Sequence, residues 1–555
     1  MCKPSLPRCL KLFVQLLLFQ VATFSGPLLA ADWQSLVQPL GTENTPFLYQ
    51  PSLLNASYDP GKGPWESGTM VTSIRTTVPQ FFVRFYNPSA SLNPSGQEGG
   101  WVMRASTVRG LTAGQVRELF ALPNIPTMMT LGLSTPGESF YTGVAAPIDG
   151  WGEGGGQQSQ SSGGPYTTFF NAQALTSSVL YYPSMAGSEN NRSIGAYLVA
   201  HQPEPYSDME LVYNSLDVLC NPASSDLFNS ALASIAPARF DDIATLGTRA
   251  LILQNQAIND RIDMLMLSDA ASGFWVRGVK SSSRRSSEGF YGDLYGILAG
   301  GDAKLGASMR SGITFGWMHG TLDWLDGGGG ARVGYCRLSA YTSVVVDNAF
   351  IQLHAGAGST RGETTRNISV PTFYQRSAHG PADSPLSALS RVAGGSYGGW
   401  DADVDIRTGA VVHAGALKIL PSAALGYLYQ SRGGFTETGA GSLNLSVAPA
   451  QSRTLLCSAG LRIDREITLE SRRTFTPYLS IRWMNTRRLD GRSVSASLNG
   501  WNDSFVTTLS RRDTRFLEGA AGIGMNVGNH LSINAACSYI GHGDGALALG
   551  LGYGL

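Results

Sequence analysis

Hydrophobic and polar residues alternate along most of the chain from about residue 274 to its end. At the C-terminus, Leu or Tyr fills every second position from Leu547 to Leu555, and Ala or Gly fills the positions between them. A period of two residues is typical of β-strands. Residues 273–555 contain about twelve runs of this kind, with Val494–Leu498 ambiguous. Clear examples lie at residues 312–317, 455–464, 478–483 and 531–539.

The two faces of these strands differ in chemistry. One face is aliphatic or aromatic, and the other is small, polar or charged. A soluble β-sandwich would bury its apolar faces, whereas an outer-membrane barrel turns them toward lipid and keeps polar residues in the lumen. Long runs, a last strand that continues to the final residue, and aromatic residues near strand ends favour the barrel. Charged residues stand inside several strands: Asp403, Asp405, Arg462, Asp464, Arg482 and Glu518.

Residues 222–270 break the alternation and predict helices. One run extends from Ser224 to Ala236, Pro237 interrupts it, and a second run extends from Arg239 to Leu267. We expect a helix of about 25 residues in the second run, too polar to contact lipid. A polar barrel interior of about twelve strands could hold one helix of about 10–12 Å diameter. A solvated linker helix is the alternative. Helical spacing is kept by Leu246, Ala250, Leu253, Ala257 and Arg261.

Short motifs in a fixed order resemble those of the classical (type V) autotransporters of Gram-negative bacteria. Each motif is weak alone, but the ordered set is specific and covers residues 221–555. The motifs are Asp226–Pro237 with the helix that follows, Phe274–Gly278, Asp293–Gly296, Gly300–Asp302, Ile419–Pro421, Leu425–Tyr427, Phe435–Glu437, Leu456–Leu461 and Pro477–Leu479.

The resemblance implies a fold and a cellular location. The fold class is all-β: a C-terminal twelve-stranded outer-membrane β-barrel with a pore helix, preceded by a small, mostly β passenger domain. In the family, the barrel anchors the protein in the outer membrane of a Gram-negative bacterium and supports export of the passenger to the cell surface. The implied partners are outer-membrane lipid and the barrel assembly machinery, which reads the last strand.

Two departures from the family pattern affect these expectations. Family members typically end in an aromatic residue, whereas this chain ends in Leu555, with Tyr553 keeping an aromatic residue on the same face. Some members cut themselves at an asparagine pair in the pore helix. Only Asn255 and Asn259 occur there in this chain, so we expect no release of the passenger by that route.

Charge and composition divide the chain further. Lys3, Arg8 and Lys11 precede and flank a mostly apolar core at Leu12–Phe24, which is typical of a secretory signal. Residues 32–217 hold 7 basic and 14 acidic residues, whereas the rest of the mature chain is mildly basic. The predicted domains are a signal peptide at 1–31, a passenger at 32–220, a linker with the pore helix at 221–270 and a barrel at 271–555.

Composition also excludes several classes of protein. The chain has 40 basic and 40 acidic residues, so it lacks the basic surplus of a nucleic-acid binder, and we expect no nucleic-acid partner. A helical membrane protein would need several apolar runs of about 20 residues, and none follows residue 31. The four cysteines beyond the signal are widely spaced and predict four buried thiols, with one disulfide possible. They are Cys220, Cys336, Cys457 and Cys537.

The passenger offers no catalytic, cofactor-binding or metal-binding constellation. Its one histidine, His201, lies in a Pro-rich stretch without a G-x-S-x-G elbow, and we interpret it as a solvated loop residue. One histidine without an HExxH motif or an EF-hand loop predicts no metal site. Thr112 and Gln115 predict a capping box that opens a short helix to Leu122. Gly150–Gln158 lacks the lysine of a phosphate-binding loop and is interpreted as a plain flexible loop.

The sequence therefore favours an autotransporter whose short passenger binds an unknown surface ligand, as an adhesion module and not as an enzyme. Two alternatives stay open. The passenger could be an enzyme carried on the same barrel. The chain could also be a porin-like channel with an N-terminal periplasmic domain.

Overall fold

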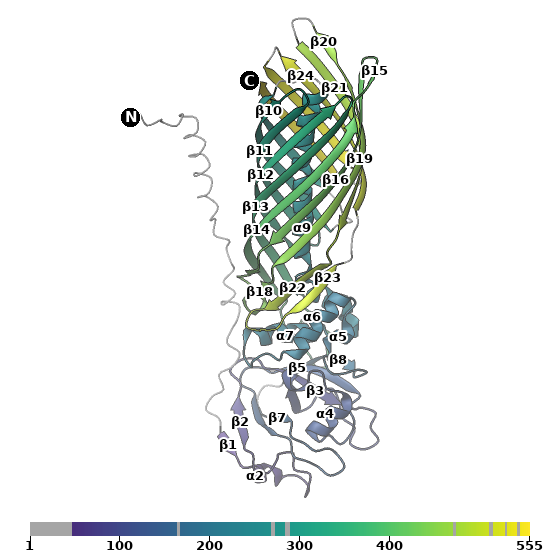
Figure 1. Cartoon of the computed structure of the whole chain (residues 1–555). Helices are drawn as coiled ribbons and strands as arrows, with labels where there is room; N and C mark the ends of the chain where they lie inside the picture. Colours follow the sequence, from purple (N-terminus) through teal and green to yellow (C-terminus); the bar gives the residue numbers. More distant parts are fainter. Residues whose placement is uncertain are drawn as a thin grey trace, which may run out of the picture.

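The barrel and an N-terminal domain lie at opposite ends of an elongated molecule (Figure 1). The computed structural model describes residues 47–554 except for 164–166, 268–271, 284–288, 470–472, 510–513, 528–529 and 541–543. The predicted signal peptide at 1–31 and the terminal Leu555 lie outside the described residues.

Twelve long antiparallel strands among the described residues form a closed barrel. The last strand pairs with the first, with Leu549 opposite Gly278. Pairing of β14 with β16 closes the sheet on the other side. Closure leaves no strand edge with unpaired backbone groups in hydrocarbon. The strands are β9 (Gly273–Ser283), β10 (Phe290–Leu305), β11 (Met309–Trp324), β12 (Gly329–Val346), β13 (Ala349–Val370), β14 (Leu389–Ala410), β16 (Leu417–Arg432), β19 (Ala450–Arg465), β21 (Arg473–Arg488), β24 (Thr514–Val527), β25 (Leu531–Ile540) and β26 (Asp544–Gly554).

The apolar face of the barrel strands points outward, as the alternation predicts. In β26, Leu547, Leu549 and Leu551 are 53–58% exposed, while the intervening Gly550 is buried. In β11, Ile313 is 64% exposed. Exposed aliphatic and aromatic side chains on every second residue are what a lipid-facing surface requires. The leucines of the last strand therefore do not form a dry core between two sheets.

Replacing Leu549 with Arg tests this orientation. Leu549 lies in the middle of β26, so the substitution would place a charge near the centre of the apolar band. We expect Leu549→Arg to destabilise the barrel by about 2–4 kcal/mol. The measurement is the midpoint of barrel unfolding in lipid vesicles, with Leu549→Ala as the uncharged control. Equal midpoints for the two variants would contradict a lipid-facing position.

The two ends of the barrel differ in the length of their connections. At one end, two tight turns join neighbouring strands at residues 306–308 and 347–348. At the other end, longer segments at 371–388, 433–449 and 489–513 join the strands. Outer-membrane barrels have short periplasmic turns and longer extracellular loops, so we call these the short-turn end and the long-loop end. The N-terminal domain lies at the long-loop end (Figure 1).

The N-terminal domain is built on an eight-stranded sheet in the order β1-β2-β6-β7-β4-β3-β5-β8. Its mostly β character agrees with the sequence prediction. The strands are β1 (Phe47–Tyr49), β2 (Val71–Arg75), β3 (Phe81–Tyr86), β4 (Trp101–Arg104), β5 (Met128–Leu133), β6 (Ser139–Val144), β7 (Gln157–Gly163) and β8 (Thr168–Ala174). Three short helices accompany them: α2 (Pro51–Asn55), α3 (Ala105–Val108) and α4 (Ala113–Phe120).

The predicted capping box is confirmed at the start of α4. Thr112 Oγ1 accepts from the Gln115 backbone N–H, and the Gln115 side chain returns to the Thr112 backbone. The glycine-rich segment is not a flexible loop, because it packs on the end of this helix. The Gly154 and Gly156 amides donate to the carbonyl oxygens of Glu118 and Leu119, each at 2.9 Å. A Cβ on Gly154 would lie 2.5 Å from a backbone oxygen, which explains the glycine there.

Residues 182–267 are largely helical, and the sequence prediction found only part of them. The predicted helices appear as α8 (Ser225–Ile235) and the 26-residue α9 (Asp242–Leu267), joined by the short η3 (Ala238–Asp241). Three further helices were not predicted: α5 (Tyr182–Met185), α6 (Glu189–Ala200) and α7 (Asp208–Leu219). None of the helices in the described part of the chain is long and apolar enough to cross a membrane.

The prediction of four buried thiols was wrong for three of the four residues, of which Cys457 is partly buried. All four are free thiols, and only Cys220 is buried, whereas Cys336 and Cys537 are exposed on the outer face of the barrel. The alternation explains the difference, because both stand at lipid-facing positions of their strands. A small, weakly polar thiol is compatible with hydrocarbon.

Candidate functional site in the barrel interior

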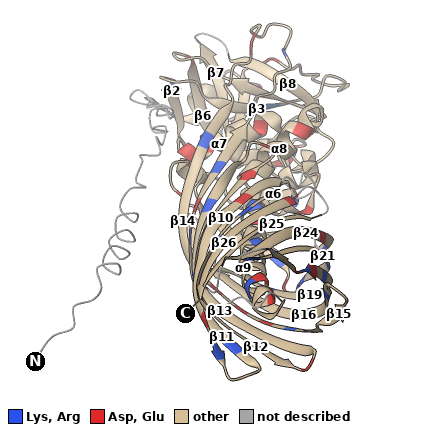
Figure 2. Cartoon of the chain, turned by 90° about the horizontal axis from the view of Figure 1, so that it is seen from above, with Lys and Arg blue, Asp and Glu red and all other residues tan. Residues whose placement is uncertain are grey.

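Helix α9 lies inside the barrel (Figure 1), and the strands around it carry Lys, Arg, Asp and Glu residues (Figure 2). Its start is at the long-loop end, next to the N-terminal domain. At its other end, Lys418 Nζ donates to the carbonyl oxygen of Leu267, the last helical residue. More than half of the helix is buried. The predicted pore helix is thus confirmed, and the alternative of a solvated linker helix was wrong.

Arg261 joins α9 to the wall near the short-turn end. Its Nε and Nη2 donate to the two carboxylate oxygens of Asp302 in β10, at 2.8 and 3.0 Å. Asp302 also accepts from the Gly273 backbone N–H at 3.0 Å and from Tyr341 Oη at 3.1 Å. Trp275 Nε1 donates to that same hydroxyl. One carboxylate therefore connects the helix, the start of the first barrel strand and two further strands.

A second charged group surrounds Asp263 on α9. Arg407 of β14 donates to Asp263 at 2.7 Å, and Arg462 of β19 lies 3.6 Å from the same carboxylate. Arg462 also donates to Asp464 through two nitrogens, both at 2.8 Å. One turn earlier on α9, Asp260 pairs with Arg277 of β9. Bidentate and buried contacts of this kind fix orientation as well as position.

The middle of α9 is held by its amide side chains. Asn255 Nδ2 donates to Asp403 in β14 at 2.8 Å, and Gln256 Nε2 donates to Glu518 in β24 at 2.9 Å. Asp403 also faces Arg337 and His354 from neighbouring strands. Asn255, considered above for self-cleavage, therefore has a wall contact in this structure.

At the long-loop end, Asp241 anchors the approach to the helix. Its carboxylate accepts from Arg488 at 2.7 Å and from Arg492 at 2.5 Å, and it is 3% exposed in its side chain. Phe240 beside it is buried against Trp324 and Phe435. The helix is thus bound to the wall along its whole length, and the narrow space left beside it includes a cavity of about 120 Å³.

The sequence identified the inward-facing charges but not their partners. Asp403, Arg462, Asp464 and Glu518 all lie inside the barrel, as their position in the alternation predicts. Arg337, His354, Asp401 and Arg407 are equally buried there and were missed. The same signal could have found them, because each is a polar residue at a lumen-facing position of an alternating strand.

His201 lies outside the barrel interior, at the junction of the N-terminal domain with the barrel loops. It is only partly exposed, so its interpretation as a solvated loop residue was wrong. Its Nδ1 lies 2.7 Å from the Tyr197 carbonyl oxygen and its Nε2 lies 2.7 Å from Asp503 Oδ1. The ring stacks on Trp501, with 4.5 Å between centroids. Both ring nitrogens face oxygen acceptors, which leaves neither in contact with a hydroxyl nucleophile.

No metal site emerges from the described ranges, in which no group of three or more His, Cys, Asp or Glu side chains could hold an ion. The site that the structure does provide is the barrel lumen with its helix. A closed barrel filled by a polar helix can anchor a chain in a membrane and connect its two sides.

Comparisons with known proteins support this assignment. Residues 274–538 match the family model described as the autotransporter beta-domain. A search of curated proteins found no match. The resemblance stated from the sequence is confirmed over the matched range.

The solved structures that are similar to the chain include three autotransporter translocators. The translocator domain of the autotransporter NalP from Neisseria meningitidis is 16% identical, with 57% of this chain and 97% of that one covered and a TM-score of 0.41. The beta domain of the Bordetella autotransporter BrkA is 17% identical, with coverages of 51% and 100% and a TM-score of 0.38. The transport unit of AIDA-I from Escherichia coli is 16% identical, with coverages of 52% and 92% and a TM-score of 0.32.

Proposed function

Because the C-terminal part of this chain is an autotransporter beta-domain in the outer membrane of a Gram-negative bacterium, we propose that its N-terminal domain is a passenger displayed at the cell surface as a binding module. The barrel inserts in the membrane and supports secretion of a passenger. Beyond this, we propose that the domain lies outside the cell and that it adheres to an unknown ligand.

The observation that carries the display proposal is the end of the barrel at which the domain lies. Helix α9 passes through the lumen, so the chain enters from the short-turn end and leaves at the long-loop end. Short turns are periplasmic and long loops are extracellular in barrels of this class. The alternative of a periplasmic N-terminal domain would require the reverse orientation.

Polar residues of the domain that could take part in catalysis are engaged in contacts within the fold, which favours a binding role. His201 is occupied by contacts with Tyr197 and Asp503, as described above. Buried Glu138 accepts from Ser161 and Thr167, and burial raises the pKa of its carboxyl group despite these hydrogen bonds. These groups join segments of the fold. We accordingly propose that the passenger is not an enzyme and that it needs no cofactor.

We also propose that the barrel assembly machinery reads the last strand, β26. Its register with β9 closes the barrel, from Asp544 opposite Ser283 to Gly554 opposite Gly273. We expect the machinery to bind β26 before the barrel closes. The edge of β26 that faces β9 is unpaired only until β9 pairs with it.

Protease treatment of intact cells tests the display. We expect a protease added outside to cleave the N-terminal domain within the largely exposed segment 89–98, while the barrel stays protected. A soluble periplasmic protein is the control for membrane integrity. Retention of treated and untreated cells on immobilised glycans and proteins then reports adhesion. Digestion only after the outer membrane is permeabilised would support the periplasmic alternative.

A further inference from the structure

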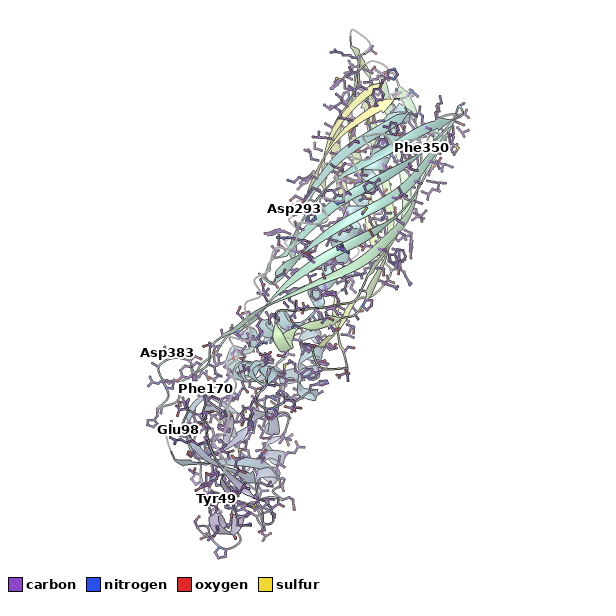
Figure 3. All side chains as sticks on the ribbon, turned by 90° about the vertical axis from the view of Figure 1, so that its left-hand side faces the viewer. Tyr49, Glu98, Phe170, Asp293, Phe350 and Asp383 are labelled. Atoms are coloured by element: carbon purple, nitrogen blue, oxygen red, sulfur yellow. The ribbon has the colours of Figure 1, made fainter. Side chains whose placement is uncertain are left out.

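Three loops at the long-loop end are more than connections between strands. Residues 435–447 and 492–509 fold into a four-stranded sheet of β17 (Phe435–Thr436), β18 (Leu445–Val447), β22 (Arg492–Leu498) and β23 (Phe505–Leu509). Residues 371–388 extend from the barrel to the level of the N-terminal sheet, where Asp383 lies near Phe170 and Glu98 (Figure 3). We call these three segments the docking platform.

We propose that the docking platform holds residues 47–220 by non-covalent contacts alone, so that the N-terminal domain stays bound to the barrel when the chain between them is cut. The proposal concerns what fixes the domain to the barrel. It does not depend on the ligand of the domain or on the side of the membrane where it lies.

Asp208, at the start of α7, provides the most polar of these contacts. It accepts from Arg391 Nη1 at 2.7 Å and from the Ser442 backbone N–H and hydroxyl at 2.9 and 2.6 Å. Burial disfavours the charged carboxylate, but the hydrogen bonds from Arg391 and Ser442 outweigh it and lower the pKa of Asp208. The ionised carboxylate is therefore matched to a buried cation and two donors contributed entirely by the barrel side.

Helix α6 lies along the segment 492–509. Asn190 exchanges two hydrogen bonds with the Thr508 backbone, at 2.8 and 2.9 Å, as a further strand would. Ser193 Oγ donates to the Val506 carbonyl oxygen at 2.9 Å, and Tyr197 Oη donates to that of Asp503 at 3.0 Å. These contacts are to backbone groups, so they require the loop to keep one conformation.

The segment 371–388 covers the edge of the N-terminal sheet. In β8, the Asn171 backbone N–H donates to the Gln375 carbonyl oxygen at 3.0 Å, and the Asn171 side-chain Oδ1 accepts from the Gln375 backbone N–H at 2.6 Å. Its side-chain nitrogen also donates to the Phe373 carbonyl oxygen at 3.1 Å. An uncovered edge strand is a site for unwanted pairing, and here the barrel's own loop occupies it.

The apolar residues of the platform explain why the contact is stable. They are almost fully buried although they belong to loops at the mouth of a barrel, and they share one core with α6, α7 and α8. Loss of α6 and α7 would expose the part of this apolar surface that they cover, and soluble surfaces rarely carry such patches. The residues are Leu443, Leu445, Val447, Val494, Ala496, Leu498 and Phe505.

The test is to cut the chain and follow the pieces. A site for a specific protease is inserted between Pro222 and Ala223, both exposed and located between α7 and α8. The full chain is purified in detergent, cut, and passed over a size-exclusion column. We expect the N-terminal piece to co-elute with the barrel. Its separation from the wild-type barrel on cutting would overturn the proposal.

Single substitutions test whether contacts with the docking platform retain the cut N-terminal piece. Asp208→Ala and Asn171→Ala should each speed release of the cut piece about tenfold or more, because each leaves buried partners unsatisfied. Ser442→Ala, on the barrel side, should weaken retention without changing the N-terminal domain itself. Glu189→Ala is the matched control, since Glu189 also begins a helix but pairs only with Arg192 in the same turn at the surface. Release unchanged in all three platform variants would overturn the proposal.

Discussion

Asp302→Ala is expected to destabilise the barrel by about 3–5 kcal/mol, the cost of breaking a buried ion pair by removing one of its two members. The Arg261 and Asp302 side chains are 4% and 0% exposed, so solvent cannot replace the lost contact. The carboxylate also holds the Gly273 backbone N–H and the Tyr341 hydroxyl. Its loss therefore loosens the helix, the first strand and the wall together.

The measurement is the temperature at which the folded barrel loses its compact form on a heat-modifiable gel. Asp326→Ala is the control, because the Arg239–Asp326 pair also joins the helical segment to a barrel loop but lies at the surface, where such pairs contribute about 0–1 kcal/mol. The double variant Arg261→Met with Asp302→Leu should unfold at a higher temperature than either single variant, since an apolar pair leaves neither charge of the broken ion pair in the interior. An unchanged transition in Asp302→Ala would show that the contact does not secure the helix.

The barrel could be predicted from the sequence because its physical signal is local. A residue in a barrel strand has only two environments, lipid or lumen, and they alternate along the chain. The alternation from Leu547 to Tyr553 can be recognised from this strand alone, without knowing which strands pair with it. The pore helix was predictable for a similar reason, since its length and its polar residues exclude both lipid and a dry core.

Pairing partners could not be predicted because they depend on strand register and on the rotation of α9. The alternation places Asp302 and Arg261 in the lumen, but it does not say that they meet. The two residues are 41 positions apart in the sequence. Arg407 and Arg462 approach Asp263 from different strands, and only the closed barrel brings them to one point.

Helices α6 and α7 were missed because their burial depends on distant segments. Ile194 and Leu198 are fully buried, but part of the surface that covers them comes from residues near 500. For the same reason Val494–Leu498 was ambiguous as a barrel strand. It is a strand, but it pairs with β18 and β23 in the platform sheet and lies outside the barrel. His201 was misread because Trp501 and Asp503, which surround it, are about 300 residues away in the chain.

Arg109→Met is expected to destabilise the N-terminal domain by about 3–5 kcal/mol, a large share of the roughly 5–15 kcal/mol that stabilises a typical domain. Arg109 donates to Asp217 at 2.6 and 3.3 Å and to Gln202 at 2.6 Å, and the Arg109 and Asp217 side chains are 1% and 0% exposed. Burial opposes the charge on Arg109, but the Asp217 carboxylate outweighs it and raises the pKa of the guanidinium. Removing Arg109 leaves that carboxylate buried with only the Tyr182 hydroxyl as a side-chain donor in the described structure.

Proteolysis of the purified full chain at increasing temperature measures this loss, because cleavage of the N-terminal domain outside the exposed segment 89–98 follows its unfolding while the barrel stays intact. Arg192→Met is the matched control, since its partner Glu189 is 84% exposed and the pair should contribute less than about 1 kcal/mol. Arg109→Met combined with Asp217→Leu should recover stability relative to the single variant, since no charge is then left in the interior. If Arg109→Met and Arg192→Met unfolded at the same temperature, the Arg109–Asp217 pair would not be what joins α7 to the end of α3.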